Sequence, residues 1–251
     1  MARELKADLH VHSRANHSPK PAKCNSLEII DRAAELGYEV LAFTDHDVVT
    51  YNEHLAEYAQ ERGILLIPGL ERTIDGRHVL LYNFDFSRDA FDTFEAIKRH
   101  KRPDALVIAP HPFFPGGHSL QHRLEENLGL FDAIELSHFY TKKIDFNKLA
   151  VEKARQYNLP LVGNSDTHFI FQLGSTYSLV EAEKDIESVI RAIKVSRVKV
   201  ISQPLNLLRF GHINLFMLLD CLSHLISLPQ PPDLADQPMN LSDQEYQRSP
   251  L

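Results

Sequence analysis

The sequence has no tryptophan, only two cysteines and only ten glycines among its 251 residues. Cys24 and Cys221 lie far apart and form no CxxC pair, which argues against a disulfide scaffold, a zinc knuckle and a redox pair. The low glycine count excludes a collagen-like chain, and the 43% hydrophobic content excludes a wholly disordered one. So little cysteine favours a reducing, cytoplasmic environment.

Basic charge is also in short supply, since 27 Lys and Arg residues face 34 Asp and Glu residues, for a net charge of −7. Adhesion to nucleic-acid backbones needs a basic footprint, so we expect no stable nucleic-acid partner. Long uninterrupted apolar runs are missing too. The most apolar stretch, residues 205–228, is interrupted by Arg209, His212, Asp220 and His224, and the first residues lack a signal-peptide core. We therefore expect neither a membrane span nor an export signal.

Short apolar runs alternate with helical patterns as far as residue 204. The expected strands are residues 7–11, 40–44, 64–68, 78–84, 105–109, 133–136, 159–162 and 198–202. The expected helices include residues 26–37, with Ser26 as N-cap, and residues 52–62, 91–101 and 186–195. Strands separated by helices predict parallel βαβ units, about seven of them, and therefore one α/β domain over residues 1–204.

The pattern changes after Pro204. Apolar residues at helical spacing predict an amphipathic helical extension over residues 205–228. We expect this helix either to pack on its own domain, which is the favoured alternative, or to form a homodimer interface. Residues 229–251 are rich in Pro, Gln, Asp and Ser, which predicts a flexible tail.

Histidine is the residue present in excess, with fourteen copies that gather where the expected strands end. Ligand-competent side chains follow successive strands at His10 and His12, His46, Glu71, His111, His138, and Asp166 and His168. Residues two apart on a strand point to the same side, and the carboxyl ends of parallel strands in a barrel converge on one rim. The sequence thus predicts that these side chains share one site.

The mixture of imidazole and carboxylate groups favours zinc, manganese, iron or nickel over magnesium or calcium. The number of such residues exceeds the three protein ligands of a typical catalytic zinc, which favours two or three ions. Each motif alone has a plainer explanation: a chance His-x-His, an N-cap at Asp45, or a strand end at His111-Pro112. The ordered series is far more specific than any one member.

These motifs also resemble a known family. The segments Asp8-Leu-His-Val-His-Ser13, Thr44-Asp-His-Asp47, Gly69-Leu-Glu71, His111-Pro112 and Asn164-Ser-Asp-Thr-His168 are similar to the ordered motifs of the PHP family, the polymerase and histidinol phosphatase domains. The resemblance spans residues 6–204 and implies a distorted (β/α)7 TIM-like barrel, a two- or three-metal site at its C-terminal rim, and phosphoester hydrolysis. Residues 175–202 resemble the short extension of small family members, which favours a small-molecule phosphatase over a proofreading module.

The resemblance also implies a role for each residue. It places His10, His12, Glu71 and Asp166 around one ion, Glu71, His111 and His138 around a second, and His46 and His168 around a third. The ions would be Mn, Fe or Zn, and their substrate a small phosphorylated metabolite or a nucleotide.

The resemblance leaves open whether two further histidines, His17 and His78, are metal ligands. His17 stands where many members have an acidic residue, and the following Ser18 replaces a glycine. Imidazole can replace a carboxylate as ligand, so His17 is a candidate for the third ion. His78 is either a reserve ligand of the second ion or an ordinary strand histidine.

Three residues are candidates for catalysis. Glu71 would bridge two ions. Asp45 would orient a ligand histidine or cap the following turn. Arg14, directly after the first motif, would bind outer phosphate oxygens or form a surface ion pair.

Two other classes of function remain open. An amidohydrolase also begins with His-x-His on a barrel strand but commonly carries a metal-bridging lysine, and no expected strand end offers one. A non-catalytic metal-binding regulatory protein would not need so complete a set of ligands.

Overall fold

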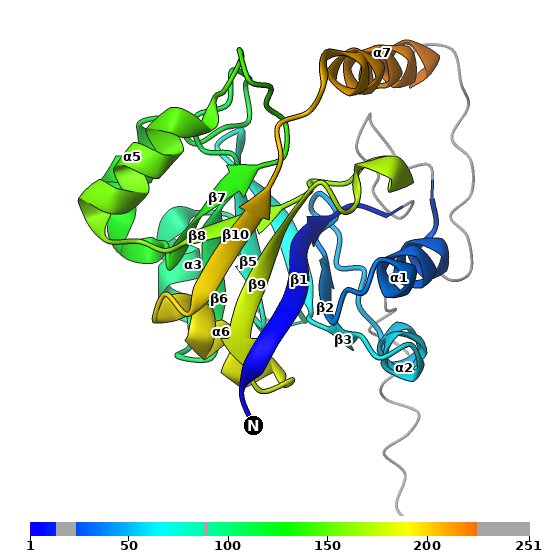
Figure 1. The fold of residues 1–251 in the computed structure, drawn as a ribbon. Coiled ribbons are helices and arrows are strands. Elements are labelled where there is room, and N and C mark those ends of the chain that lie inside the picture. The colour runs from blue at the N-terminus through cyan, green and yellow to red at the C-terminus, as the bar shows by residue number, and fades with distance from the viewer. Residues whose placement is uncertain (14–23, 88–89, 225–251) are drawn as a thin grey trace, which may run out of the picture.

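The computed structural model describes residues 1–13, 24–87 and 90–224, with side chains described as far as residue 215 (Figure 1). The strands are β1 (Arg3–Val11), β2 (Val40–Phe43), β3 (Leu65–Leu66), β4 (Gly69–Ile74), β5 (Arg77–Tyr82), β6 (Leu106–Ala109), β7 (Ala133–Ser137), β8 (Leu161–Asn164), β9 (Thr176–Ala182) and β10 (Val198–Ser202). The α-helices are α1 (Ser26–Glu35), α2 (Glu53–Glu61), α3 (Phe94–His100), α4 (Arg123–Glu126), α5 (Asn147–Tyr157), α6 (Ile186–Lys194) and α7 (Leu207–His224). The expected α/β class is confirmed. Asn25, rather than Ser26, caps α1, because the Asn25 side chain accepts a hydrogen bond from the backbone N–H of Glu28.

The strands form two five-stranded sheets. Sheet A has the order β10-β9-β1-β2-β3, and sheet B has the order β4-β5-β6-β7-β8. The expectation of parallel pairing throughout is wrong. Pairing is parallel for β1-β2-β3 and β6-β7-β8, but β5 is antiparallel to both β4 and β6, and β9 is antiparallel to both β1 and β10.

A tight hairpin explains the reversal at β4 and β5. The two strands are joined by Asp75 and Gly76, whose φ angles are 49° and 73°. Two successive residues with positive φ are what a type I′ turn requires, and Asp-Gly is a preferred pair for it. Because of the hairpin, Glu71 lies within strand β4. The sequence pattern had placed it after the end of a strand at residues 64–68.

A bulge in β1 brings the first two histidines into the interior. Pairing of β1 with β2 runs from Asp8 opposite Leu41 to Val11 opposite Phe43, so β1 holds one extra residue. Before the bulge, Leu5, Ala7 and Leu9 pack in the core between the sheets, whereas Val11 packs in the outer core beneath α1 and α2. The extra residue therefore reverses which side chains of β1 point inward. Bulges next to active sites commonly redirect side chains in this way.

Three apolar cores hold the layers together. The central core lies between the two sheets and takes in α6, which Figure 1 shows at their lower end. A second core packs α3, α4 and α5 against the outer face of sheet B, and a third packs α1 and α2 against the outer face of sheet A. In Figure 1 the arrowheads of β7 and β10 point to the upper end of the sheets, which is left to loops and α7.

The C-terminal extension forms a helix, α7, where residues 205–228 were predicted to be helical. It is attached by Phe210, whose ring stacks on Phe139 at 4.6 Å, and by Ile213, which is 2% exposed. These two residues contact the domain, whereas Leu207, Leu208 and Leu215 on the same helix are exposed. Packing on the domain and the homodimer both stay predictions. Residues 225–228 and the predicted tail 229–251 lie outside the described residues. Among the helices of the described part, none is long and apolar enough to cross a membrane.

Gly163 in β8 is a point of close approach to sheet A. A Cβ atom there would lie 2.6 Å from Cγ1 of Val200 and 2.9 Å from the backbone oxygen of Tyr177. We expect Gly163→Ala to lower the free energy of unfolding by about 1–3 kcal/mol, as overpacking typically does. Urea denaturation measures the change. Gly129→Ala is the matched control, because a Cβ atom at Gly129 meets nothing within 4 Å. Equal stability of the two variants would contradict the close packing of β8 on sheet A.

Candidate metal centre

The predicted ligands meet where two single bridges join the sheets. Val11 pairs with Thr167, and His46 pairs with Glu71. Backbone hydrogen bonds accompany both bridges, including His12 N to Thr167 O at 2.9 Å and Asp47 N to Glu71 O at 2.9 Å. The end of β1 is thereby held beside the segment after β8, and the segment after β2 beside β4, so that side chains distant in sequence converge.

Two imidazole nitrogens, His10 Nε2 and His12 Nε2, each lie close to two carboxylate oxygens, Glu71 Oε2 and Asp166 Oδ1. The two nitrogens lie 3.1 Å apart. Glu71 Oε2 lies 3.4 Å from the first nitrogen and 3.3 Å from the second, and Asp166 Oδ1 lies 3.3 and 3.1 Å from them. Ligands about 2.0–2.1 Å from a tetrahedral ion lie roughly 3.3 Å from one another. The spacing therefore fits an ion held by His10, His12 and Asp166, with Glu71 Oε2 beside both imidazoles.

Glu71 faces imidazoles on both of its oxygens. Oε2 lies 2.9 Å from His46 Nδ1, while Oε1 lies 2.9 Å from His78 Nδ1 and 3.5 Å from His111 Nε2. The side chain is 1% exposed, and neither oxygen accepts a hydrogen bond. Burying a carboxylate that accepts no hydrogen bond costs free energy unless cations neutralise its charge. This arrangement fits a carboxylate that bridges two ions.

Within the described residues, four groups of three side chains have ligand atoms within 4.8 Å of one another. They are His12, His46 and His168; His10, Glu71 and His111; His10, His12 and Asp166; and His46, Glu71 and His78. The donor set is imidazole nitrogen and carboxylate oxygen, which suits first-row transition metals. The groups overlap, so the geometry suits more than one ion.

The pKa shifts of the two carboxylates and of His12 match this donor set. Burial opposes protonation of His10, but Glu135, Asp166 and Glu71 outweigh it and hold the pKa of His10 well above its usual value. Burial alone would raise the pKa of Glu71, but the surrounding imidazoles, His78 foremost, outweigh it and hold the pKa well below its usual value. Burial likewise opposes ionisation of Asp166, and its contacts with His10 and His12 hold the pKa well below the usual value. Burial and neighbouring imidazoles hold the pKa of His12 far below normal. The carboxylates are thus ionised and His12 is neutral, as metal ligation requires.

Glu135 on β7 supports the ligands without joining them. Its Oε1 accepts hydrogen bonds from His10 Nδ1 at 2.8 Å and from Asn164 Nδ2 at 2.9 Å, and its Oε2 accepts from His111 N at 2.8 Å. A carboxylate that accepts a hydrogen bond from Nδ1–H leaves the Nε2 atom of the same imidazole free to bind a metal. The sequence prediction missed Glu135, although a carboxylate in the middle of an apolar strand was the available signal.

The remaining predicted residues are placed as follows. His168 is in the site and donates from Nδ1 to the backbone oxygen of Asp166 at 3.1 Å, which leaves its Nε2 free. His138 is 2% exposed but belongs to none of the four groups. Asp45 accepts hydrogen bonds from both N and Oγ of Ser13 at 2.7 Å, and lies 3.9 Å from His12 Nδ1. Arg14 and His17 lie outside the described residues.

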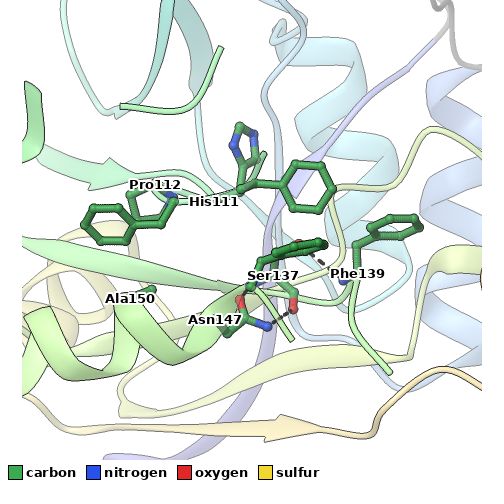
Figure 2. A pocket seen from close by; sticks show the side chains of 9 residues that line it. His111, Pro112, Ser137, Phe139, Asn147 and Ala150 are labelled. Atoms are coloured by element: carbon green, nitrogen blue, oxygen red, sulfur yellow. Dashed lines mark hydrogen bonds between the residues drawn. The ribbon is translucent and has the colours of Figure 1, made fainter. Parts of the chain in front are cut away.

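An aromatic pocket borders the site beside His111 (Figure 2). Phe114 contacts Phe139 edge-on, with ring centroids 5.6 Å apart, and Phe146 at 5.1 Å. Beneath the rings, Ser137 and Asn147 exchange two hydrogen bonds, of 2.9 and 3.0 Å. The metal centre therefore has an apolar wall on its β6–β7 side.

Glu135→Gln tests the supporting carboxylate. An amide has one oxygen, so either the Nδ1 proton of His10 or the N–H of His111 loses its acceptor. We expect metal affinity to fall by about 10- to 100-fold, as measured by competition with a coloured chelator. Glu152→Gln, on the exposed face of α5, controls for the change in charge. Unchanged affinity in the Glu135 variant would show that this carboxylate does not prepare the ligands.

The PHP domain matches residues 8–173. An uncharacterized protein of Methanocaldococcus jannaschii is 29% identical over 157 residues, which cover 59% of this chain and 91% of that one. A 3′,5′-nucleoside bisphosphate phosphatase of Chromobacterium violaceum is 38% identical over 74 residues, 29% of this chain and 25% of that one.

A similar solved structure is a two-domain protein from Bacteroides vulgatus that contains a predicted PHP-like metal-dependent phosphoesterase. It superposes with a TM-score of 0.64 at 20% identity, over 88% of this chain and 71% of that one. The likeness shows that the two share a fold. Because the family match covers well over half of the sequence, this chain belongs to the PHP domain family.

Proposed function

We propose that this protein hydrolyses a phosphoester of a small phosphorylated metabolite or nucleotide in a two- or three-metal site. The observation that carries the proposal is Glu71, an ionised and buried carboxylate whose two oxygens face separate sets of imidazoles and accept no hydrogen bond. Membership of the PHP domain family supports the proposal. A similar solved structure, which contains a predicted PHP-like metal-dependent phosphoesterase, supports it as well.

The family resemblance and the geometry together support a specific assignment of ligands. His10, His12, Glu71 and Asp166 would hold the first ion, Glu71, His78 and His111 the second, and His46 and His168 the third. The resemblance alone adds His17, which lies outside the described residues, to the third. This assignment uses His78 in the place that the family resemblance gave to His138, because His78 Nδ1 lies 2.9 Å from Glu71 Oε1. Manganese, iron and zinc all suit the donor set.

When bound, divalent ions supply Lewis acidity toward phosphoryl oxygens and lower the pKa of an attacking water. The protein side chains orient that chemistry. Asp45 holds the backbone N–H and hydroxyl of Ser13, and so anchors the start of the segment that carries Arg14. Arg14 would bind the outer phosphate oxygens with its two parallel N–H donors.

Two observations support a nucleotide among the candidate substrates. The Chromobacterium violaceum relative is named for a nucleoside bisphosphate. The aromatic rings of Phe114 and Phe139 beside His111 offer a surface on which a planar base can pack.

We also propose that the barrel implied by the resemblance is closed at this rim. The two single bridges, at Val11–Thr167 and at His46–Glu71, support a ring of β1, β2, β4, β5, β6, β7 and β8. Such a ring would contain seven strands, with β3, β9 and β10 outside it.

The reaction is tested with the full chain loaded in turn with Mn²⁺, Fe²⁺ and Zn²⁺. p-Nitrophenyl phosphate, nucleoside monophosphates and bisphosphates, and phosphorylated metabolites are the substrates, and phosphate release is the readout. We expect metal-dependent release from at least one class, abolished by a chelator. No release across all metals and substrates would overturn the proposal.

Glu71→Ala tests the bridging role. Removing one carboxylate that serves two ions should lower the bound metal by at least one ion per chain and abolish phosphate release. Elemental analysis of the dialysed protein measures the first effect. His212→Ala is the control, since His212 is exposed on α7, and it should leave metal content and activity unchanged. Unchanged metal content in the Glu71 variant would refute the bridge.

A further inference from the structure

The C-terminal helix α7 touches the domain through an aromatic contact. The ring of Phe210 stacks on the ring of Phe139, with centroids 4.6 Å apart and planes 24° from parallel. Ile213, one turn further along the helix, is buried. Phe139 comes two residues after the end of β7, directly after His138, so the contact lies at the end of the sheets that carries the metal centre (Figure 1).

The described side chains of α7 make no polar contact with the rest of the domain. Among residues 207–215, Asn214 donates a hydrogen bond to the backbone oxygen of Phe210 at 2.7 Å, within the helix itself. Asn206, just before the helix, accepts the N–H of Arg209 at 2.8 Å. Apolar side chains alone therefore attach this part of α7 to the described domain.

The segment before α7 is held by hydrogen bonds. The N–H of Leu205 donates to the backbone oxygen of Tyr140 at 2.8 Å, and Leu205 is buried. The hydroxyl of Ser202, at the end of β10, donates to the hydroxyl of Tyr140 at 3.0 Å. The chain is thus fixed beside Phe139 as far as residue 205, and the helix beyond it can leave Phe139 without breaking a described hydrogen bond to the domain.

The stacked ring of Phe210 covers a surface that suits a planar ligand. Phe139 lines the aromatic pocket together with His111 (Figure 2). The cavity in this pocket measures about 10 Å³, room for about one water molecule, so a nucleobase does not fit while the rings are in place. A base on Phe139 would lie nearly parallel to the ring, as Phe210 does.

We propose that Phe210 is a built-in competitor for the base of a nucleotide substrate. The contact of Phe210 with Phe139, here called the latch, closes when no base is bound and opens when a base stacks on Phe139. The competition with a base rests on the proposed function, because it assumes a nucleotide whose phosphate lies at the metal centre. The latch itself does not.

The latch has a consequence of definite sign. A ligand that binds only molecules with an open latch has its apparent affinity reduced by the fraction of molecules that are open. Loss of the Phe210 ring therefore strengthens the binding of a nucleotide. A ring that only formed a wall of the pocket would have the opposite effect, because its loss would weaken binding. A phosphorylated sugar without a base does not need Phe139 and should not respond.

The first test compares adenosine 5′-monophosphate with ribose 5-phosphate on the metal-loaded full chain. Affinity is measured as KM for a ligand that is hydrolysed and by titration calorimetry for one that is not. We expect Phe210→Ala to bind the nucleotide about tenfold more tightly, with kcat unchanged, and Phe139→Leu to bind it about tenfold more weakly. Neither change should alter the affinity for ribose 5-phosphate.

Leu208→Ala is the matched control, since Leu208 is 77% exposed on the same turn of α7, and it should leave both affinities unchanged. Unchanged or weaker binding of the nucleotide by Phe210→Ala would overturn the competition. So would an equal change in the affinity for ribose 5-phosphate, because that ligand has no base.

The second test places a fluorophore in the latch. The chain has no tryptophan, so Phe210→Trp carries a single indole. In the protein loaded with Zn²⁺, a d¹⁰ ion without redox chemistry, we expect blue-shifted emission from a stacked indole. The emission should shift to the red when Phe139→Ala is added, and also when adenosine 5′-monophosphate but not ribose 5-phosphate is bound. Emission typical of an exposed indole before any addition would refute the latch.

Hydrogen exchange separates the latch from the proposed function, because it needs neither metal nor substrate. We expect Phe139→Ala to speed exchange of the backbone amides of α7 and to leave those of α6, which packs in the central core, unchanged. Equal exchange of α7 in the variant and the wild type would refute the latch. Failure of the wild type to hydrolyse any phosphoester would count against the proposed function, while emission and exchange would still decide whether the latch exists.

Discussion

The structure depends on one ionised carboxylate buried among imidazoles. Burying a charge is costly unless opposite charge or hydrogen bonds compensate for it. Glu71 has no hydrogen-bond donor, and its oxygens lie within 3.5 Å of nitrogens from five histidines. The same residue forms one of the two backbone bridges that join sheet B to sheet A. One join between the sheets and the cluster of imidazoles thus coincide at Glu71.

Around this carboxylate, the supporting hydrogen bonds decide what each imidazole can do. Glu135 accepts a hydrogen bond from Nδ1 of His10, and the backbone oxygen of Asp166 accepts one from Nδ1 of His168. In both rings the lone pair of Nε2 stays free for a metal. Gln172 Nε2 contacts His138 Nε2 instead. Histidines of equal chemistry therefore differ in which ring nitrogen is free, according to the neighbour that each one meets.

Local sequence patterns predicted the α/β class, most strands and the helices well, because periodicity and caps act within a few residues. They missed β4 and β9, and they did not show that the Asp75-Gly76 turn reverses the chain between β4 and β5. They also could not show the bulge in β1, since pairing with β2 creates it. Both departures matter to the site, because the hairpin places Glu71 beside His78 and the bulge turns His10 inward.

By itself, the sequence determined which chemical groups the rim would offer: imidazoles and carboxylates following successive strands, in an order that the PHP family shares. Only the tertiary structure decided how those groups are combined. Spacing along the chain cannot tell that His78 lies 2.9 Å from Glu71 while His138 contacts Gln172 instead. Ligand sets depend on distances between strands far apart in sequence, and those distances follow from sheet register and packing, which no local pattern records.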